Sequence, residues 1–323
     1  MKDMDARSLS RIQSYFSRFA ARNKISGYVA SVTSKGTSLQ FCGGNLSPDA
    51  GMPVNNDTLF EIGSLSKPIT AAVIFSLYEK HKLDIDSPVV PYLDGEYEVD
   101  PVFEHIRIRD ILVHLSGLPR IPHSLLLKME GNEDPYAVVS KQDIANYLES
   151  PVEITKPGKF NYSNFGYSLL AEIIKLITRK SFDEACWDNL FKDLGMTRTG
   201  TSGKFSNDEN KAVGYTIGGK RSVYWTGPFL DGPGSILSTN RDMFVFLQHM
   251  MQVPGPAARG WQCKKGLIAK WLGYRDYYWH NGMTGGFSSY MAFNRKKNAG
   301  MCVLLNKACI PDPLFYYFSS FAR

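Results

Sequence analysis

The chain has 323 residues, of which 43% are hydrophobic and 21% are charged. This length and composition suit one large folded domain or two interleaved lobes and argue against a disordered protein. The net charge of +6 comes from Lys and Arg residues dispersed among acidic ones, so a nucleic-acid-binding surface is not indicated. The five cysteines are scattered and include no C-x-x-C pair, which argues against a disulfide framework or a zinc site.

No segment reaches the roughly 18 consecutive apolar residues that a membrane span needs, and charged residues occupy the start of the chain. A signal peptide would have its apolar stretch at that place. We therefore expect a cytoplasmic protein with free thiols and without a membrane span.

The first predicted element is an amphipathic helix over residues 8–22, where apolar residues recur at helical spacing. Two β-rich runs follow at 27–33 and 38–42, on either side of a turn that contains a glycine. This arrangement predicts a β-hairpin, on which the first helix should pack.

The first group of chemically suggestive residues is Ser64 and Lys67, just before an apolar segment at 69–80 that predicts a buried helix. Residues three apart share one face of a helix, so the Ser64 hydroxyl and the Lys67 amine can meet. A desolvated lysine favours its neutral form and can act as a base, while the helix entry favours negative charge on an attacked carbonyl. The plainer interpretation is an N-cap serine, either Ser64 or Ser66, beside a solvated lysine.

The second group lies in a polar loop, where Tyr162 and Asn164 precede a predicted apolar helix at 169–177. Near a lysine ammonium, Tyr162 can be held as a phenolate and serve as a base for Ser64 and as an acid toward a leaving group. Asn164 can hold Lys67 in place and offer a hydrogen bond to a substrate. An ordinary helix-capping segment is the alternative interpretation.

The third group lies at 277–289, where aromatic residues give way to glycines. This pattern predicts a strand that another backbone can approach closely. A substrate carbonyl along that strand would meet the N–H of Met283, which with the N–H of Ser64 would form an oxyanion hole. His280 is the only histidine set beside such glycines, and the alternative for it is a structural role.

Towards the end of the chain, runs at 287–294 and 301–306 predict a second hairpin, and 311–323 predicts a closing aromatic-rich helix. Strands at both ends around a helical middle indicate an α/β (α+β) fold with one antiparallel sheet assembled from both ends. We expect a sheet lobe from 1–83 and 227–323, an inserted mainly helical lobe from 84–226, and the active site between them.

The order of the three groups, and roughly the distances between them, resemble the serine β-lactamase and penicillin-recognising DD-peptidase superfamily. Within it, the chain is similar to the class C β-lactamases and their esterase relatives, over residues 58–306. Two connecting segments, 108–119 and 231–239, also look familiar and are interpreted as scaffold, with His114 as a satisfied core histidine. The motifs that carry the resemblance are Ser64-Leu65-Ser66-Lys67, Tyr162-Ser163-Asn164, and His280-Asn281-Gly282 where many members have Lys-Thr-Gly.

The resemblance implies a β-lactamase/transpeptidase-like fold and a role for each matched residue. These roles are Ser64 as nucleophile, Lys67 and Tyr162 as the base and acid pair, Asn164 as orienting residue, His280 as third-motif residue, and the Met283 N–H in the oxyanion hole. Which of Lys67 and Tyr162 takes the first proton stays open. An imidazole at position 280 lacks the fixed positive charge that would pair with the carboxylate of a β-lactam, which disfavours penicillin hydrolysis.

Three functions are weighed on this basis. The first is a β-lactamase-like esterase, a serine hydrolase acting on an ester or amide of a small molecule. The second is an acyl transferase, transesterase or cyclase in which an alcohol or amine accepts the acyl group, because water access and the acceptor pocket decide the fate of an acyl-enzyme. The third is a non-catalytic ligand-binding relative.

The expected partner is a small-molecule acyl substrate, and no cofactor or metal is needed for acyl and proton transfer. The apolar stretch 122–129 is interpreted either as a lid over an acyl chain or as an ordinary amphipathic helix. The aromatics at 277–279 are expected in the same cleft. The candidate substrate-binding residues are Asn281, Gly282, Thr284, Trp225 and Phe229.

Overall fold

The computed structural model describes residues 6–49, 51–152, 154–263 and 276–310, together with 314, 317 and 318. The predicted closing helix at 311–323 therefore lies almost entirely outside the described residues. No helix in the described ranges is long and apolar enough to cross a membrane.

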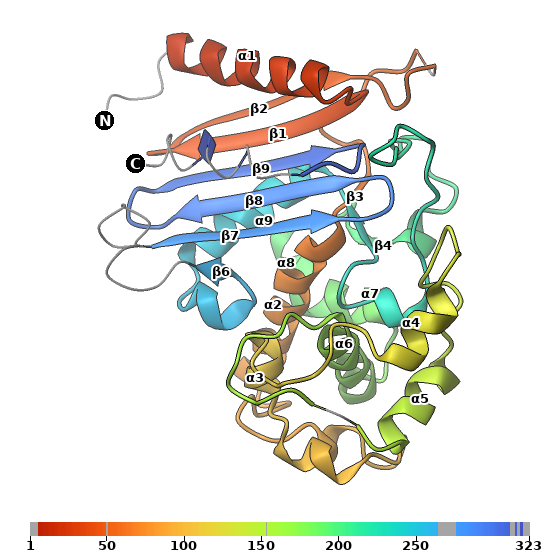
Figure 1. Ribbon diagram of the computed structural model, residues 1–323. Coiled ribbons are helices and arrows are strands. Elements are labelled where there is room, and N and C mark those ends of the chain that lie inside the picture. Colours follow the sequence, from red (N-terminus) through yellow and green to blue (C-terminus); the bar gives the residue numbers. More distant parts are fainter. Residues whose placement is uncertain are drawn as a thin grey trace.

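The fold is built on a six-stranded antiparallel sheet with the strand order β2-β1-β9-β8-β7-β6 (Figure 1). The first and last parts of the chain meet where β1 pairs with β9, which confirms a sheet assembled from both ends. Both predicted hairpins are present, as β1 with β2 and β8 with β9. The strands are β1 (Gly27–Ser34), β2 (Thr37–Gly44), β6 (Gln262–Cys263), β7 (Tyr277–Met283), β8 (Ser288–Asn294) and β9 (Ala299–Leu305).

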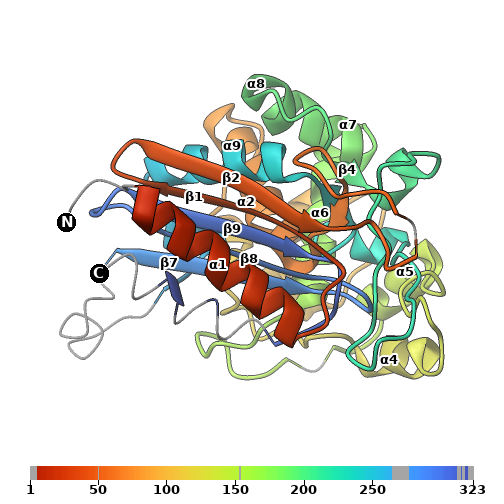
Figure 2. The same cartoon turned by 90° about the horizontal axis from the view of Figure 1, so that it is seen from above.

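The central strands are covered on both faces. Side chains of a strand alternate between faces, and in β1 Tyr28 and Val32 belong to one apolar cluster while Val29 belongs to the other. Helix α1 (Ala6–Arg22) lies across the first face, where its Phe16 is buried (Figure 2). Covering both faces explains why every residue of β1, β8 and β9 is buried.

The second face packs on α9 (Asn240–Gln252), which contacts β8 and β9. Below it, α2 (Ser66–Glu79) runs between the sheet and helix α6 (Asn164–Thr178) (Figure 1). A helix enclosed in this way needs an apolar surface all round. This explains why α2 buries eleven of its residues, among them Ile69, Val73 and Leu77.

Short elements complete the chain. A second small sheet has the order β3-β5-β4, and β4 comes from within 84–226 while its partner β5 does not, so the two expected lobes share this sheet. The lobe boundaries themselves stay a prediction. The remaining elements are α3 (Ile108–Leu112), α4 (His123–Met129), α5 (Lys141–Glu149), α7 (Phe182–Cys186), α8 (Lys192–Leu194), β3 (Phe60–Glu61), β4 (Gly200–Thr201) and β5 (Ile236–Ser238).

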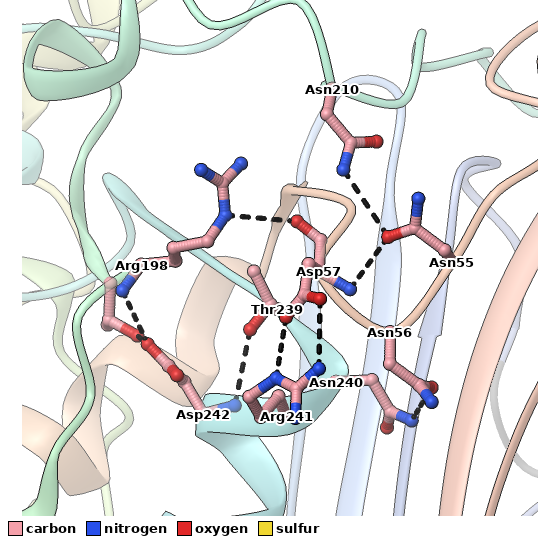
Figure 3. A network of polar contacts seen from close by, with 10 residues as sticks. Asn55, Asn56, Asp57, Arg198, Asn210, Thr239, Asn240, Arg241 and Asp242 are labelled. Atoms are coloured by element: carbon pink, nitrogen blue, oxygen red, sulfur yellow. Dashed lines mark hydrogen bonds and ion pairs between the residues drawn. The ribbon is translucent and has the colours of Figure 1, made fainter.

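A polar network fixes the segment that leads into β3 (Figure 3). Asp57 accepts hydrogen bonds from Arg241 Nε (2.6 Å) through its carboxylate and from Arg198 Nε (3.1 Å) through its carbonyl. Next to it, Asn240 Nδ2 donates to Asn56 Oδ1 at 2.8 Å. Three distant stretches of the chain are thereby joined a few residues before Ser64.

Candidate active site

Ser64 lies in a single turn of 3₁₀-helix (Gly63–Leu65) that leads directly into α2. Gly63 has φ +51°, and a Cβ built on it would lie 2.8 Å from the Met283 nitrogen. Only glycine accepts both this backbone conformation and this close approach. Ser66 is the first residue of α2, and its hydroxyl accepts from the Ile236 N–H at 3.4 Å instead of capping the helix.

Lys67 is fully buried beside Ser64. Its Nζ lies 3.1 Å from Ser64 Oγ and donates a 2.9 Å hydrogen bond to the carbonyl of Pro233. Burial, followed by the positive charge of Arg120, holds the pKa of the lysine well below its usual range. A neutral amine in hydrogen-bond reach of a serine hydroxyl can accept its proton.

Tyr162 lies on the other side of Lys67, with the centre of its ring 4.7 Å from Nζ. Burial raises the pKa of the phenol to about 12, and a hydrogen-bonding interaction with the Ser64 side chain offsets this only in part. The side chain is therefore a neutral phenol and a proton donor. The expected phenolate disagrees with this raised pKa, because burial disfavours the charged form of the phenol.

Asn164 is the first residue of α6, behind the N-cap Ser163, whose hydroxyl accepts from the Gly166 N–H. Its Nδ2 donates to the Tyr136 hydroxyl at 3.4 Å, and its buried Oδ1 has no partner among the described residues. The expected hydrogen bond from Asn164 to Lys67 is thus absent, and the Pro233 carbonyl takes that place. Asn164 Oδ1 is left able to accept from a substrate N–H.

His280 lies on β7 and is almost fully buried. Burial, with the nearby Lys67, lowers the pKa of its imidazole to about 3, so the ring is uncharged at neutral pH. Its Nδ1 lies 2.8 Å from the carbonyl oxygen of Asn281. His114 is also buried and accepts from the Ser163 N–H at 3.1 Å, but its Nε2 has no partner in the described structure, so it is only half satisfied.

The backbone of β7 packs directly on the turn that carries Ser64. A Cβ on Gly282 would lie 2.0 Å from the Ile62 carbonyl oxygen and 2.9 Å from the Ser64 nitrogen. Any larger residue at position 282 would separate the two segments. Both Ser64 and Met283 line the cavity at this contact, and that their N–H groups form an oxyanion hole stays a prediction.

A buried carboxyl group that we did not expect lies behind this region. Glu61 accepts hydrogen bonds from Thr284 Oγ1 at 2.6 Å and from the backbone N–H of Trp225. Burial raises the pKa of Glu61 to about 8. Glu61 thus ties the strand before the nucleophile to two walls of the cleft, and its place in the sequence between the apolar Phe60 and Ile62, both buried, was the signal.

These segments enclose a cavity of about 370 Å³. Of the residues expected in the site, those that line it are Ser64, Tyr162, Asn164, Trp225, Asn281, Met283 and Thr284. Lys67, His280 and Gly282 lie behind its wall.

Two expectations for the cleft wall are wrong. Phe229 is buried and stacks on Tyr136, with 5.9 Å between ring centres, so it supports the wall from behind. The aromatics at 277–279 also point elsewhere: Tyr277 packs in the apolar cluster under α1, and Trp279 lines a separate hollow.

Sequence reasoning missed several lining residues. Pro233 and Gly234 lie inside a segment interpreted as scaffold, Arg120 and Leu230 lie next to such segments, and only the fold turns the six residues toward Ser64. They are Arg120, Tyr136, Leu230, Pro233, Gly234 and Gln262.

An apolar groove of about 490 Å³ adjoins the cavity and shares Tyr136 and Trp225 with it. Helix α4 forms one side, and its Leu126 and Leu127 are 50% and 60% exposed. The stretch 122–129 is therefore a helix that presents leucines to the solvent beside the cavity. That it covers an acyl chain stays a prediction.

Comparison with known proteins decides the family. A family model described as Beta-lactamase matches residues 12–312. The chain belongs to the beta-lactamase family. Among solved structures, this beta-lactamase-family chain is similar to a class C beta-lactamase (TM-score 0.77, 21% identity, 94% of this chain and 92% of the other). It is also similar to the octameric penicillin-binding protein homologue from Pyrococcus abyssi (TM-score 0.76, 22% identity, 93% and 73%). At these identities the likeness shows the β-lactamase/transpeptidase-like fold.

The curated relatives are longer proteins, and the chain matches only part of each. "Putative penicillin-binding protein PbpX" of Bacillus subtilis (strain 168) is 26% identical over 262 residues, which are 77% of this chain and 63% of that protein. "Protein flp" of Staphylococcus aureus (strain N315) is 26% identical over 284 residues, 80% of this chain and 55% of that protein. The beta-lactamase-family chain thus spans somewhat more than half the length of these relatives.

Proposed function

We propose that this chain is a serine hydrolase that forms an acyl-enzyme on Ser64 and hydrolyses an ester or amide of a small molecule. The observation that carries the proposal is the 3.1 Å approach of Ser64 Oγ to the Nζ of a fully buried Lys67. A lysine in this setting is a base, because the folded chain excludes the water that would stabilise its charge.

In the acylation step, Ser64 Oγ attacks the substrate carbonyl carbon and its proton passes to the neutral amine of Lys67. The oxyanion lies toward the N–H groups of Ser64 and Met283, which stabilise its charge. When the tetrahedral intermediate collapses, the phenol of Tyr162 protonates the leaving group and regains a proton from the Lys67 ammonium. The bond to the leaving group breaks and the acyl group remains on Ser64.

In the second step, water takes the place of the leaving group. It attacks the acyl carbonyl and gives its proton to the neutral amine of Lys67, and the resulting ammonium returns a proton to Ser64 Oγ as the ester bond to Ser64 breaks. An alcohol or amine in the position of water would turn the same machinery into an acyl transferase.

The character of the third motif supports an ester substrate over a penicillin. The uncharged His280 offers no fixed positive charge on β7. Asn281 lines the cavity there and offers neutral hydrogen bonds.

The test is intact-protein mass spectrometry after treatment with a fluorophosphonate, followed by turnover of para-nitrophenyl esters and of a penicillin. Wild type should gain one adduct that is absent in Ser64→Ala and present in the matched control Ser66→Ala. Adding methanol to the ester assay separates hydrolysis from acyl transfer by the product formed. No adduct and no turnover in wild type would refute the hydrolase and leave a ligand-binding protein.

A further inference from the structure

We propose that the substrate carries an anionic group, a carboxylate or a phosphate, and that Arg120 binds it. The inference rests on the proposed function, because it names a property of the substrate of that same cavity. It comes from a guanidinium that takes no part in the proton transfers of the proposed reaction.

Arg120 is the only charged side chain among the described residues that line the cavity. The other lining residues are neutral, with tyrosine, asparagine, glutamine, threonine and backbone groups in the majority. No aspartate or glutamate of the described chain forms an ion pair with Arg120. A permanent cation is thus presented to the cavity without an internal counter-ion.

The backbone at this position is firmly held. The carbonyl oxygen of Arg120 accepts from the N–H of Asn164 at 2.9 Å and from the N–H of Phe165 at 3.1 Å, at the start of α6. The guanidinium carbon lies 5.3 Å from the centre of the Tyr162 ring, which is its closest ring contact. The charge is therefore placed beside the proposed acid of the reaction by backbone contacts. The side chain is exposed and forms no hydrogen bond to another described residue, so its N–H donors can reach a ligand.

Among the described residues, no other side chain near Ser64 can take this role. Lys67 is buried behind the wall and donates to the Pro233 carbonyl, and His280 is buried and has only its neighbour's carbonyl as a partner. A guanidinium offers paired N–H donors that match the two oxygens of a carboxylate or the oxygens of a phosphate. In a partly enclosed cavity such a pair gains strength, because fewer water molecules compete for it.

The experiment compares matched substrates on wild type, Arg120→Gln and Arg120→Lys. One pair changes the acyl side: the para-nitrophenyl monoester of glutaric acid against its methyl ester. The other pair changes the leaving group: para-acetoxybenzoate against methyl para-acetoxybenzoate. Arg11→Gln removes one positive charge from the exposed surface of α1 and is the charge control.

We expect Arg120→Gln to lower kcat/KM for the anionic member of one pair by about tenfold or more, while the neutral member changes by less than about threefold. Arg120→Lys should show a smaller loss than Arg120→Gln, since lysine keeps the positive charge but lacks the paired N–H donors of the guanidinium. The pair that responds shows on which side of the scissile bond the anion lies. Inhibition of neutral ester hydrolysis by glutarate or by inorganic phosphate, lost in Arg120→Gln, then separates carboxylate from phosphate.

The inference is overturned if Arg120→Gln changes both members of both pairs by the same factor while the fluorophosphonate still labels Ser64. A failure of the proposed function has a different signature, namely no label and no turnover in wild type. In that case glutarate and phosphate binding by calorimetry, wild type against Arg120→Gln, still tests the anion site. If wild type and Arg120→Gln bind glutarate and phosphate equally well by calorimetry, the anion site at Arg120 is refuted.

Discussion

The pKa values of the titratable side chains around Ser64 are shifted more by burial than by neighbouring charges. Lys67 and His280 are both buried, and burial is the main cause that lowers the pKa of each. Tyr162 and Glu61 are shifted in the opposite direction for the same reason, since burial always favours the neutral form. Burial therefore favours the neutral form of these four groups in the protein without substrate, and in the proposed reaction charge develops on Lys67 and on the oxyanion.

The first prediction concerns the pH dependence of ester hydrolysis. The neutral amine of Lys67 is the active form, so kcat/KM should rise with pH through the lowered pKa of Lys67 and then stay level. Tyr162→Phe should lower kcat/KM by about 10²–10⁴-fold but keep the rise with pH. Lys67→Met should abolish both the activity and the rise. A profile that falls from acidic to neutral pH would contradict a neutral lysine base.

The second prediction concerns Glu61 and stability. Its folded pKa of about 8 lies above the ordinary value of 4.5, so between these pH values the folded state holds a proton that the unfolded state releases. The contribution of Glu61 to stability is complete below the lower value and is lost as pH rises through the higher one. Wild type should therefore lose stability relative to Glu61→Gln as pH rises between these two values. The difference between their free energies of unfolding should change by on the order of 1 kcal/mol per pH unit.

Urea unfolding at several pH values, followed by circular dichroism, measures this difference. Glu149→Gln is the control, because its side chain is exposed at the end of α5 and the variant should run parallel to wild type. A constant difference between Glu61→Gln and wild type would show that Glu61 is ionised in the folded state.

At the scale of elements, the site is made by close contact between segments that carry little chemistry of their own. Strand β7 and the turn before α2 meet backbone to backbone, which glycines at 63 and 282 allow. Helix α4 adds an apolar wall, because its Leu126 and Leu127 are exposed beside the cavity, while Leu125 is buried.

The third prediction tests whether the groove along α4 takes the apolar part of a substrate. Leu126→Ser with Leu127→Ser should lower kcat/KM for a para-nitrophenyl ester of octanoate by about three- to tenfold through KM, because less apolar surface is buried on binding. The acetate ester should be affected little. Ile217→Ser, an equally exposed apolar residue, is the control, and equal loss on both esters would assign the groove no part in binding.

At the scale of the whole molecule, the N-terminal and C-terminal parts of the chain are joined by polar contacts of the buried Asn240. Asn240 at the start of α9 accepts from Ser31 Oγ at 2.6 Å and donates to the Ala30 carbonyl at 3.2 Å and to Asn56 at 2.8 Å. A buried amide with all its partners fixes the position of the first strand relative to the segment before Ser64.

The fourth prediction compares two neighbours in this network. Asn240→Ala should lower the free energy of unfolding by about 1–3 kcal/mol, because Ser31 and Asn56 lose their buried partner. Arg241→Gln should cost less than about 1 kcal/mol, since its ion pair with Asp57 is exposed. Urea denaturation of both variants measures the two values, and a larger loss for Arg241→Gln would reverse our assignment of the stabilising contact.

The sequence by itself determined the local elements and the chemistry they carry. Periodicity and turn residues predicted α1, both hairpins and the helices after Ser64 and Asn164, because each depends on neighbours in the chain. The residue types at 64, 67 and 162 were each open to an ordinary capping or structural interpretation, and it was the matched motifs together that predicted the family and suggested acyl transfer by a serine.

Only the tertiary structure decided which side chains face the cavity and what charge they hold. Phe229 turned out to stand behind the wall and Arg120 in it, because orientation depends on packing between segments far apart in sequence. The neutral phenol of Tyr162 and the carboxyl of Glu61 follow from burial, which no local pattern gives. The Pro233 carbonyl holds Lys67 in place of Asn164 for the same reason: a backbone acceptor has no signature in the sequence, and only the fold brings it within 2.9 Å of the amine.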